Sequence, residues 1–169
     1  MPKPLRVFVE VVDRFNRIIG RIVMFMVFVM IAVLLYSSVS KTFHLPAIWT
    51  LEMAQFLMVA YFLLGGAYSM QLDAHVRMDL FYSRWSPRTR AIVDSVTVLL
   101  LIFYLVLLLY GGLSSTWYAI EYRETSYSSW SPLMAPIKII MCIGIFMMLL
   151  QALATLVKDV ARARGESLE

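Results

Sequence analysis

The chain has 169 residues, of which 61% are hydrophobic and only 15% are charged, and its mean hydropathy is +0.77. Soluble domains are typically about half apolar and a quarter charged, so this composition excludes a soluble domain and indicates a chain that folds in lipid. The formal net charge of +4 does not indicate nucleic-acid binding, because the basic residues lie between and beyond apolar segments and form no basic face.

Charged and apolar residues recur at helical spacing in the first 21 residues. This pattern predicts an amphipathic helix over about 4–17 that lies at the membrane surface, followed by a first membrane span over about 18–39. A cleavable signal peptide ending near Ser38-Val39-Ser40 is the alternative interpretation. The length and mixed charge of the preceding segment favour the membrane anchor.

A second apolar segment begins at Trp49 and Glu52 and ends at Asp73. The part from Met53 to Leu72 would rise about 30 Å as a helix, which matches the hydrocarbon thickness of a bilayer, so a span is predicted over about 52–72. Gly65 and Gly66 form a small-residue patch where another helix could approach closely. The helical spacing of apolar residues after Ala74 predicts a second interfacial helix over about 74–85.

The remaining sequence predicts two further spans, over about 91–113 and about 137–157. Ser86-Pro87 is a helix-start signal, whereas Gly111-Gly112 need not end the helix that follows. Aromatic residues of the kind found at membrane boundaries are dense between the two spans. The predicted fold is therefore an all-α integral membrane protein, with residues 1–169 forming a single membrane domain of four transmembrane helices and two amphipathic interfacial helices.

Lys and Arg are distributed unevenly among the connecting segments. Five lie before residue 22, four lie between the second and third spans, and three lie in the C-terminal tail. The other connections hold only Lys41, Arg123 and Lys138. Because basic connections stay on the cytoplasmic side, both termini and the central loop are expected to be cytoplasmic. Lys138 opposes this rule, and its expected partner is Glu121, Glu124 or a lipid phosphate.

The sequence offers no reactive centre. Its only histidines, His44 and His75, fall on opposite membrane sides in this topology, so they cannot share a metal or haem. Metalloprotease, nucleophile-elbow and phosphate-loop motifs are absent, and the single Cys142 cannot form an intrachain disulfide. Charges are also absent from the centres of the spans, where they would mark a proton or ion path. We therefore expect no enzyme activity and no cofactor.

Two ionisable residues beside the second span have alternative interpretations. Glu52 lies at the N-terminal end of a helix, where an acid complements the helix dipole, although a carboxylate there could also couple to ion movement. His75 lies in a charged run that would fix the break between the span and the interfacial helix, although it could instead sense pH.

Several motifs occur in an order and spacing typical of one family. Trp49-x-x-Glu52 precedes Gly65-Gly66-Ala67, and His75-Val-Arg-Met-Asp79 follows. The last third of the chain adds Ser129-Trp130-Ser131-Pro132, Pro136-Ile137-Lys138 and Leu149-Leu150-Gln151-Ala152-Leu153. Over about residues 15–160 the chain resembles the small, DctQ-like membrane subunit of tripartite ATP-independent periplasmic (TRAP) transporters. One departure is Leu133 after Pro132, where members of that family often have a second proline.

The resemblance implies a non-catalytic permease subunit of the bacterial inner membrane that scaffolds a large transport subunit. In that family the large subunit carries the substrate and ion sites, and an extracytoplasmic solute-binding protein delivers the solute, commonly an organic acid. The expected partners are these two proteins and membrane lipids, without nucleic acid. The residues expected to determine the subunit interface or the fold, none of them binding substrate, are Trp49, Glu52, Gly65, Gly66, His75, Asp79, Trp130 and Pro132.

Two other functions are compatible with the sequence. A self-associating four-span channel or carrier would need a continuous polar face, and helical placement of the polar residues in the spans provides none. An accessory subunit of an unrelated membrane complex would have the same physical properties as a transporter scaffold. The identity of the neighbouring genes would distinguish an accessory subunit of another complex from a transporter scaffold.

Overall fold

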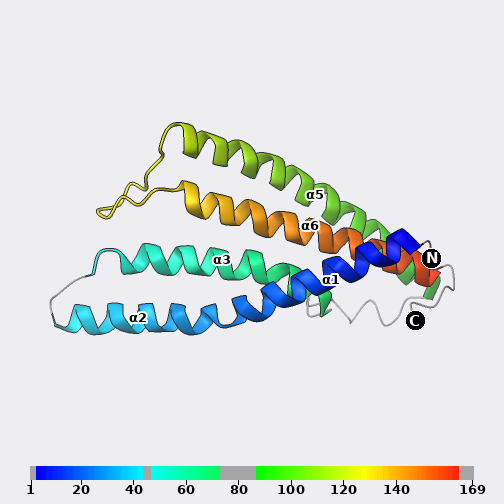
Figure 1. The fold of residues 1–169 in the computed structure, drawn as a ribbon, viewed down its shortest axis with the longest axis horizontal. Helices are drawn as coiled ribbons and strands as arrows, with labels where there is room; N and C mark the ends of the chain where they lie inside the picture. Colours follow the sequence, from blue (N-terminus) through cyan, green and yellow to red (C-terminus); the bar gives the residue numbers. More distant parts are fainter. Residues whose placement is uncertain (1–2, 44–46, 73–86, 164–169) are drawn as a thin grey trace.

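The computed structural model describes residues 3–43, 47–72 and 87–163, in which the regular elements are α-helices (Figure 1). An isolated antiparallel bridge between Thr125 and Leu133 lies in the connection before the last helix. The helices are α1 (Lys3–Met24), α2 (Met26–Thr42), α3 (Thr50–Gln71), α5 (Pro87–Glu121) and α6 (Ala135–Ala163).

Within the residues that the structure describes, four helical segments are long and apolar enough to cross a membrane. They are Leu5–Thr42, which joins α1 and α2, and then Thr50–Gln71, Val96–Glu121 and Ala135–Val160. Lipid offers no water to backbone groups, so apolar segments of this length adopt helices, which satisfy their own hydrogen bonds. The prediction of an all-α protein with four membrane-spanning helices is confirmed.

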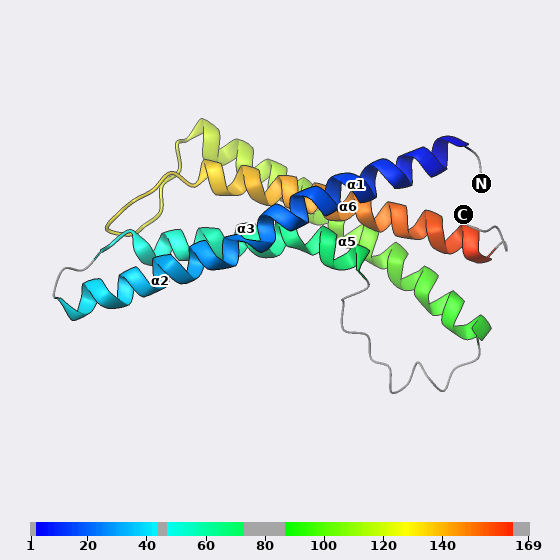
Figure 2. The ribbon, with the colours of Figure 1, turned by 60° about the horizontal axis from the view of Figure 1, so that its bottom comes forward.

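The helices lie side by side in the order α5, α6, α3 and α2 (Figure 1). Helix α1 continues from α2 and crosses α3 and α6 at the end of the molecule where both termini lie (Figure 2). Helix α6 therefore has neighbours on both sides, and 39% of the residues in its most apolar part are buried within the chain, against 6% for α5. The edge helices leave most of their apolar surface uncovered.

The buried contacts fall into two groups along α6. Near the termini, Val9 and Val12 of α1 pack against Ala154. Farther along the helix, Leu105 of α5 packs with Ile145 and Ala152. Small residues on α3 and α6 allow the helices to approach closely, as expected where lipid removes the hydrophobic drive for helix association.

Helix boundaries differ from the expected ones in two places. The helix expected over about 18–39 is interrupted at Phe25. Here the Phe25 N–H donates to the Ile22 carbonyl and the Phe28 N–H donates to the Phe25 carbonyl, each at 3.1 Å and each only three residues back. This tighter spacing interrupts the α-helical ladder without a proline. Helix α5 begins at Pro87, as the helix-start signal predicts, and continues through Gly111 and Gly112 to Glu121. The interfacial helix predicted over about 74–85 lies outside the described residues.

Candidate functional site

Five polar residues from three helices form a buried to half-buried cluster near the termini, here called the Asp13 cluster: Asp13, Asn16, Gln71, Gln151 and Lys158. Asn16 Nδ2 donates to Gln151 Oε1 at 2.6 Å, and Gln151 Nε2 donates to Asp13 Oδ1 at 3.1 Å. Lys158 Nζ lies 2.6 Å from Asp13 Oδ2, and Gln71 Nε2 donates to the Asp13 carbonyl at 3.2 Å. The cluster therefore joins α1 to both α3 and α6.

The centre of the Asp13 cluster is shielded from the surroundings of the protein. Gln151 and Asn16 are 0% and 1% exposed, so their hydrogen bonds offset the cost of removing amide groups from water. Asn16 Oδ1 and Gln71 Oε1 are buried and have no hydrogen-bond partner among the residues that the structure describes. A network of this kind fixes both the rotation and the position of α1 on the other helices.

Sequence reasoning did not identify the Asp13 cluster. It assigned no role to Asp13, and it named Gln151 only as part of the motif Leu149-Leu150-Gln151-Ala152-Leu153. The available signal is positional, because Asp13 and Asn16 are three residues apart, and Gln151 and Lys158 seven, so each pair shares a helix face. A pair of polar residues on an otherwise apolar helix face indicates that the face contacts polar residues of another helix, and each of these two pairs could serve as the partner of the other.

A second polar region lies at the opposite end of the helices. Lys138 Nζ pairs with Glu124 Oε2 at 2.5 Å and reaches the Ser115 carbonyl at 3.5 Å. Glu124 is thus the partner of Lys138 among the alternatives that the sequence left open. Glu52 Oε1 accepts a hydrogen bond from Ser126 Oγ at 3.1 Å, which links α3 to the α5–α6 connection. Glu52 Oε2 is buried without a hydrogen-bond partner in the described part of the chain.

Trp49 lies at the junction of α2 and α3. Its ring packs against Tyr36 with centroids 5.9 Å apart. Nearby, Thr50 Oγ1 lies 2.9 Å from Ser37 Oγ and 2.8 Å from the Ala47 carbonyl. These contacts hold the start of α3 against the end of α2.

Trp130 and Pro132 lie in a compact connection between α5 and α6. The connection begins with Arg123 at a φ of 48°, and Glu124 N–H bonds back to the Ala119 carbonyl at 3.1 Å, which is a Schellman-type helix end. The Pro132 carbonyl accepts from Ser126 N–H at 3.0 Å. Pro132 therefore helps to close the loop, while the Trp130 side chain is partly exposed at its surface.

The glycines predicted to lie at a close approach differ in their surroundings. A Cβ on Gly66 would lie 2.9 Å from Met148 Sδ, whereas one on Gly65 would meet only Val23 Cγ1 at 3.8 Å. Closer approaches involve Gly20, which faces Tyr68, and Gly144, where a Cβ would lie 2.8 Å from Leu63 Cβ. Sequence reasoning did not single out Gly20 or Gly144. The predicted motif residues His75 and Asp79 lie outside the described ranges.

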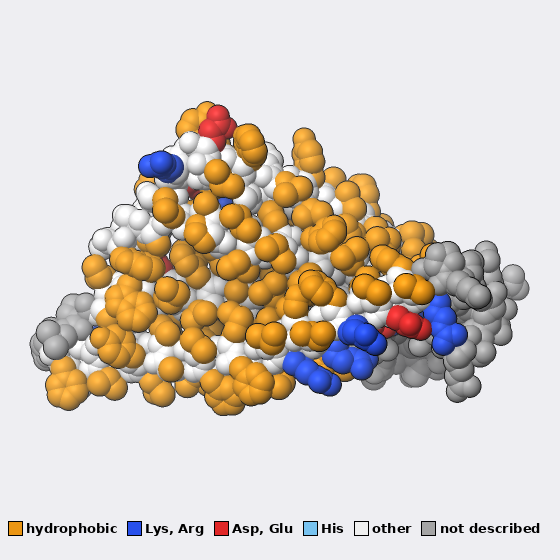
Figure 3. All heavy atoms as spheres, in the orientation of Figure 1, with side chains coloured by type: hydrophobic (Ala, Val, Ile, Leu, Met, Phe, Trp, Pro, Cys, Tyr) orange, Lys and Arg blue, Asp and Glu red, His pale blue; other side chains and the backbone are white. Residues whose placement is uncertain are grey.

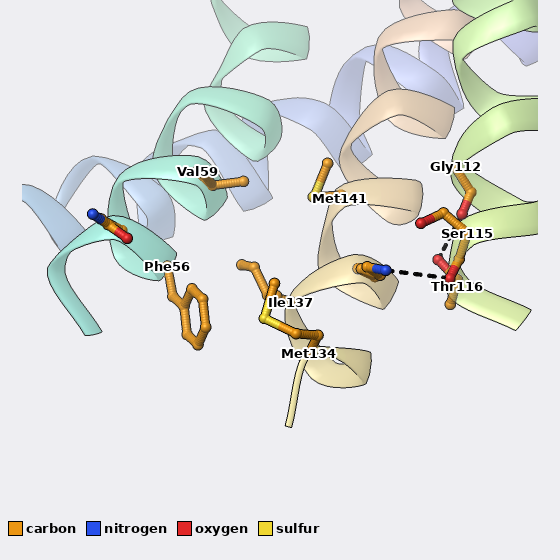
Figure 4. A pocket seen from close by; sticks show the side chains of 10 residues that line it. Phe56, Val59, Gly112, Ser115, Thr116, Met134, Ile137 and Met141 are labelled. Atoms are coloured by element: carbon orange, nitrogen blue, oxygen red, sulfur yellow. Dashed lines mark hydrogen bonds between the residues drawn. The ribbon is translucent and has the colours of Figure 1, made fainter. Parts of the chain in front are cut away.

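A groove of about 230 Å³ lies between α3 and α5, with α6 as its floor (Figure 4). Its charged lining residue, Lys138, is already paired with Glu124. The groove can accommodate an apolar side chain or part of an acyl chain, because the surface that lines it is mostly apolar. It is lined by Gln55, Phe56, Val59, Gly112, Ser115, Thr116, Met134, Ile137, Lys138 and Met141.

Comparison with protein families agrees with this arrangement of packed, apolar helices. Residues 30–162 match the family described as tripartite ATP-independent periplasmic transporters, DctQ component. No individual curated protein matches the chain with significant similarity. The matched range includes α3, α5 and almost all of α2 and α6, which is most of the chain. The chain therefore belongs to the DctQ family, the small component of tripartite ATP-independent periplasmic transporters.

Proposed function

We propose that this chain is a non-catalytic scaffold that enlarges the static part of its transporter, against which a large membrane subunit moves solute. The observation that carries this proposal is the uncovered apolar surface of the edge helix α5. Leu100, Phe103 and Tyr110 on this helix are 63%, 63% and 77% exposed. Such a surface needs lipid or another membrane subunit as its neighbour, and a transporter component has such a subunit available.

The distribution of buried polar residues supports a scaffold over a self-associating channel. In the described helices these residues are Asn16 and Gln151 near the termini and Ser37, Thr50 and Thr116 toward the opposite end. Leu105 and Ile145 occupy the core between them. A water or ion path would need polar groups throughout this region, because charges and partly hydrated ions are costly in an apolar core.

The expected arrangement in the membrane follows from charge. Figure 3 shows basic side chains gathered over α1 near the termini, while the remaining visible surface is mostly hydrophobic. The positive-inside tendency supports placing this end, with both termini, in the cytoplasm of a bacterial cell. The transporter to which this chain contributes would be an ion-coupled, binding-protein-dependent uptake system for organic acids.

Within this proposal, the predicted motif residues determine the fold or the subunit interface and do not contact solute. Trp49, Glu52 and Pro132 join neighbouring helices and loops, and Gly66 permits close packing. Gly65, Trp130, His75 and Asp79 are candidates for contacts with the large subunit.

Co-expression with the large subunit tests the proposal. A tag on this chain should retain the large subunit through detergent extraction and size-exclusion chromatography. In proteoliposomes supplied with the solute-binding protein, uptake should require both membrane subunits. Liposomes that contain this chain alone should show no flux. A chain that elutes by itself, together with uptake that is unchanged by its deletion, would remove the scaffold function, and flux through the chain alone would favour a channel.

A further inference from the structure

Helix α1 carries three distinct stripes along its length. At 3.6 residues per turn, positions near multiples of that period share a face. One stripe packs on α3 and α6 and is buried: Val9, Val12, Asn16, Gly20 and Val23. The other two stripes are exposed, and they differ sharply in chemistry.

The second stripe is apolar and remains uncovered by the rest of the chain. Its members are 50–66% exposed: Val7, Val11, Phe15, Ile18 and Ile22. An apolar row of this length requires a non-aqueous neighbour. It lies beside the buried stripe, so the same helix presents one apolar face to its own bundle and another to its surroundings.

The third stripe is basic and borders the apolar one. Arg14, Arg17 and Arg21 are all exposed, and they have no ion-pair partner within the described ranges. Arg6 extends the stripe, but it is bonded to Glu10 at 3.1 Å. Figure 3 shows this gathering of basic side chains next to an acidic one over α1. Three unpaired guanidinium groups therefore follow one line on the helix surface.

We propose that Arg14, Arg17 and Arg21 bind the phosphate groups of anionic phospholipids, while the adjacent apolar stripe inserts among the acyl chains. A membrane boundary offers negative charge on one side and hydrocarbon on the other, which is the arrangement that these two stripes match. Arg14 and Arg21 are separated by roughly 10 Å along the helix axis, so the stripe spans a patch of headgroups. Zwitterionic lipids offer the same phosphate without net charge and bind more weakly.

The Asp13 cluster gives this surface a fixed orientation. Asn16 lies on the buried stripe, and its hydrogen bond to Gln151 prevents α1 from rolling about its own axis. The basic stripe therefore cannot turn toward the bundle, and the apolar stripe cannot turn away from lipid.

Native mass spectrometry of the full chain, purified in detergent and incubated with phosphatidylglycerol or phosphatidylcholine, tests the proposal. We expect preferential retention of phosphatidylglycerol, weakening as ionic strength rises. Replacing Arg14, Arg17 and Arg21 with glutamine one at a time should lower the phosphatidylglycerol affinity by about fivefold each, and the triple variant by more than tenfold. The triple lysine variant should keep most of the preference.

Removing charge elsewhere provides the matched control. Lys41→Gln with Arg123→Gln removes two exposed positive charges at the other end of the molecule and should leave the preference unchanged. An equal loss in this control would show a net-charge effect and overturn the proposal. So would an unchanged preference in the triple glutamine variant. Because the measurement uses this chain alone, its outcome does not depend on the scaffold function.

Discussion

Replacing Gly144 with alanine is expected to force α3 and α6 apart at a close backbone contact. The added Cβ would lie 2.8 Å from Leu63 Cβ, 2.9 Å from the Leu63 carbonyl carbon and 3.1 Å from the carbonyl oxygen. All three atoms belong to the backbone or are fixed to it, so a side-chain rotation cannot relieve the contact. The helices must shift or the pair must separate.

The size of the effect follows from two opposing contributions. Overpacking of a close contact costs about 1–3 kcal/mol, and a clash with backbone atoms belongs at the upper end. Alanine recovers about 1 kcal/mol through its higher helix propensity. The expected net loss is about 2 kcal/mol in the free energy of unfolding.

Gly111 is a matched control on α5. A Cβ there would meet nothing within 4 Å, so Gly111→Ala should be neutral or stabilising by up to about 1 kcal/mol. Unfolding in micelles of increasing sodium dodecyl sulfate content, followed by circular dichroism, measures both variants. Adding Leu63→Ala to Gly144→Ala should not restore stability, because the Cβ and carbonyl of residue 63 remain. Equal stability of the Gly144→Ala and Gly111→Ala variants would refute the close-packing argument.

Two further predictions concern the polar contacts of α6 and use the same unfolding assay. Gln151→Leu removes the acceptor of Asn16 and the donor to Asp13. It should lower the free energy of unfolding by about 2–3 kcal/mol, because polar groups are left buried without partners. A smaller loss than that caused by substituting an exposed apolar residue would contradict the stabilising role of the Asp13 cluster. Lys138→Met leaves Glu124, whose side chain is 33% exposed and can regain water, so we expect a smaller loss of about 1 kcal/mol. A larger loss for Lys138→Met than for Gln151→Leu would reverse this order and refute it.

The number and type of the spans could be predicted from the sequence because each span depends on local composition. Hydrocarbon thickness sets the segment length, and the loss of water sets the helical conformation. The start of α5 at Pro87 was predictable for a similar reason, since proline fits the first helical position. In each case the information lies within one short segment.

Contacts between segments could not be predicted in the same way. Asn16 and Gln151 are 135 residues apart, so their pairing depends on how α1 lies on α6. Gly144 and Gly111 have the same local chemistry in apolar helices, yet only the first meets a neighbouring backbone. The break at Phe25 likewise has no proline or glycine at that position, and it lies between α2, which packs on α3, and α1, which packs on both α3 and α6.

Helix α6 is the element on which α1, α3 and α5 are positioned, and each of its three levels uses different chemistry. At the first level, Gln151 and Lys158 bind α1 by hydrogen bonds and charge. At the second, Gly144 leaves room for the backbone of α3. At the third, Lys138 contacts the Ser115 carbonyl and Cys142 contacts Thr116, both near the end of α5. A change at one level cannot be taken up by sliding α6 along its axis, because the other two levels resist that movement. This resistance to sliding is the property that a static scaffold requires when the subunit beside it moves.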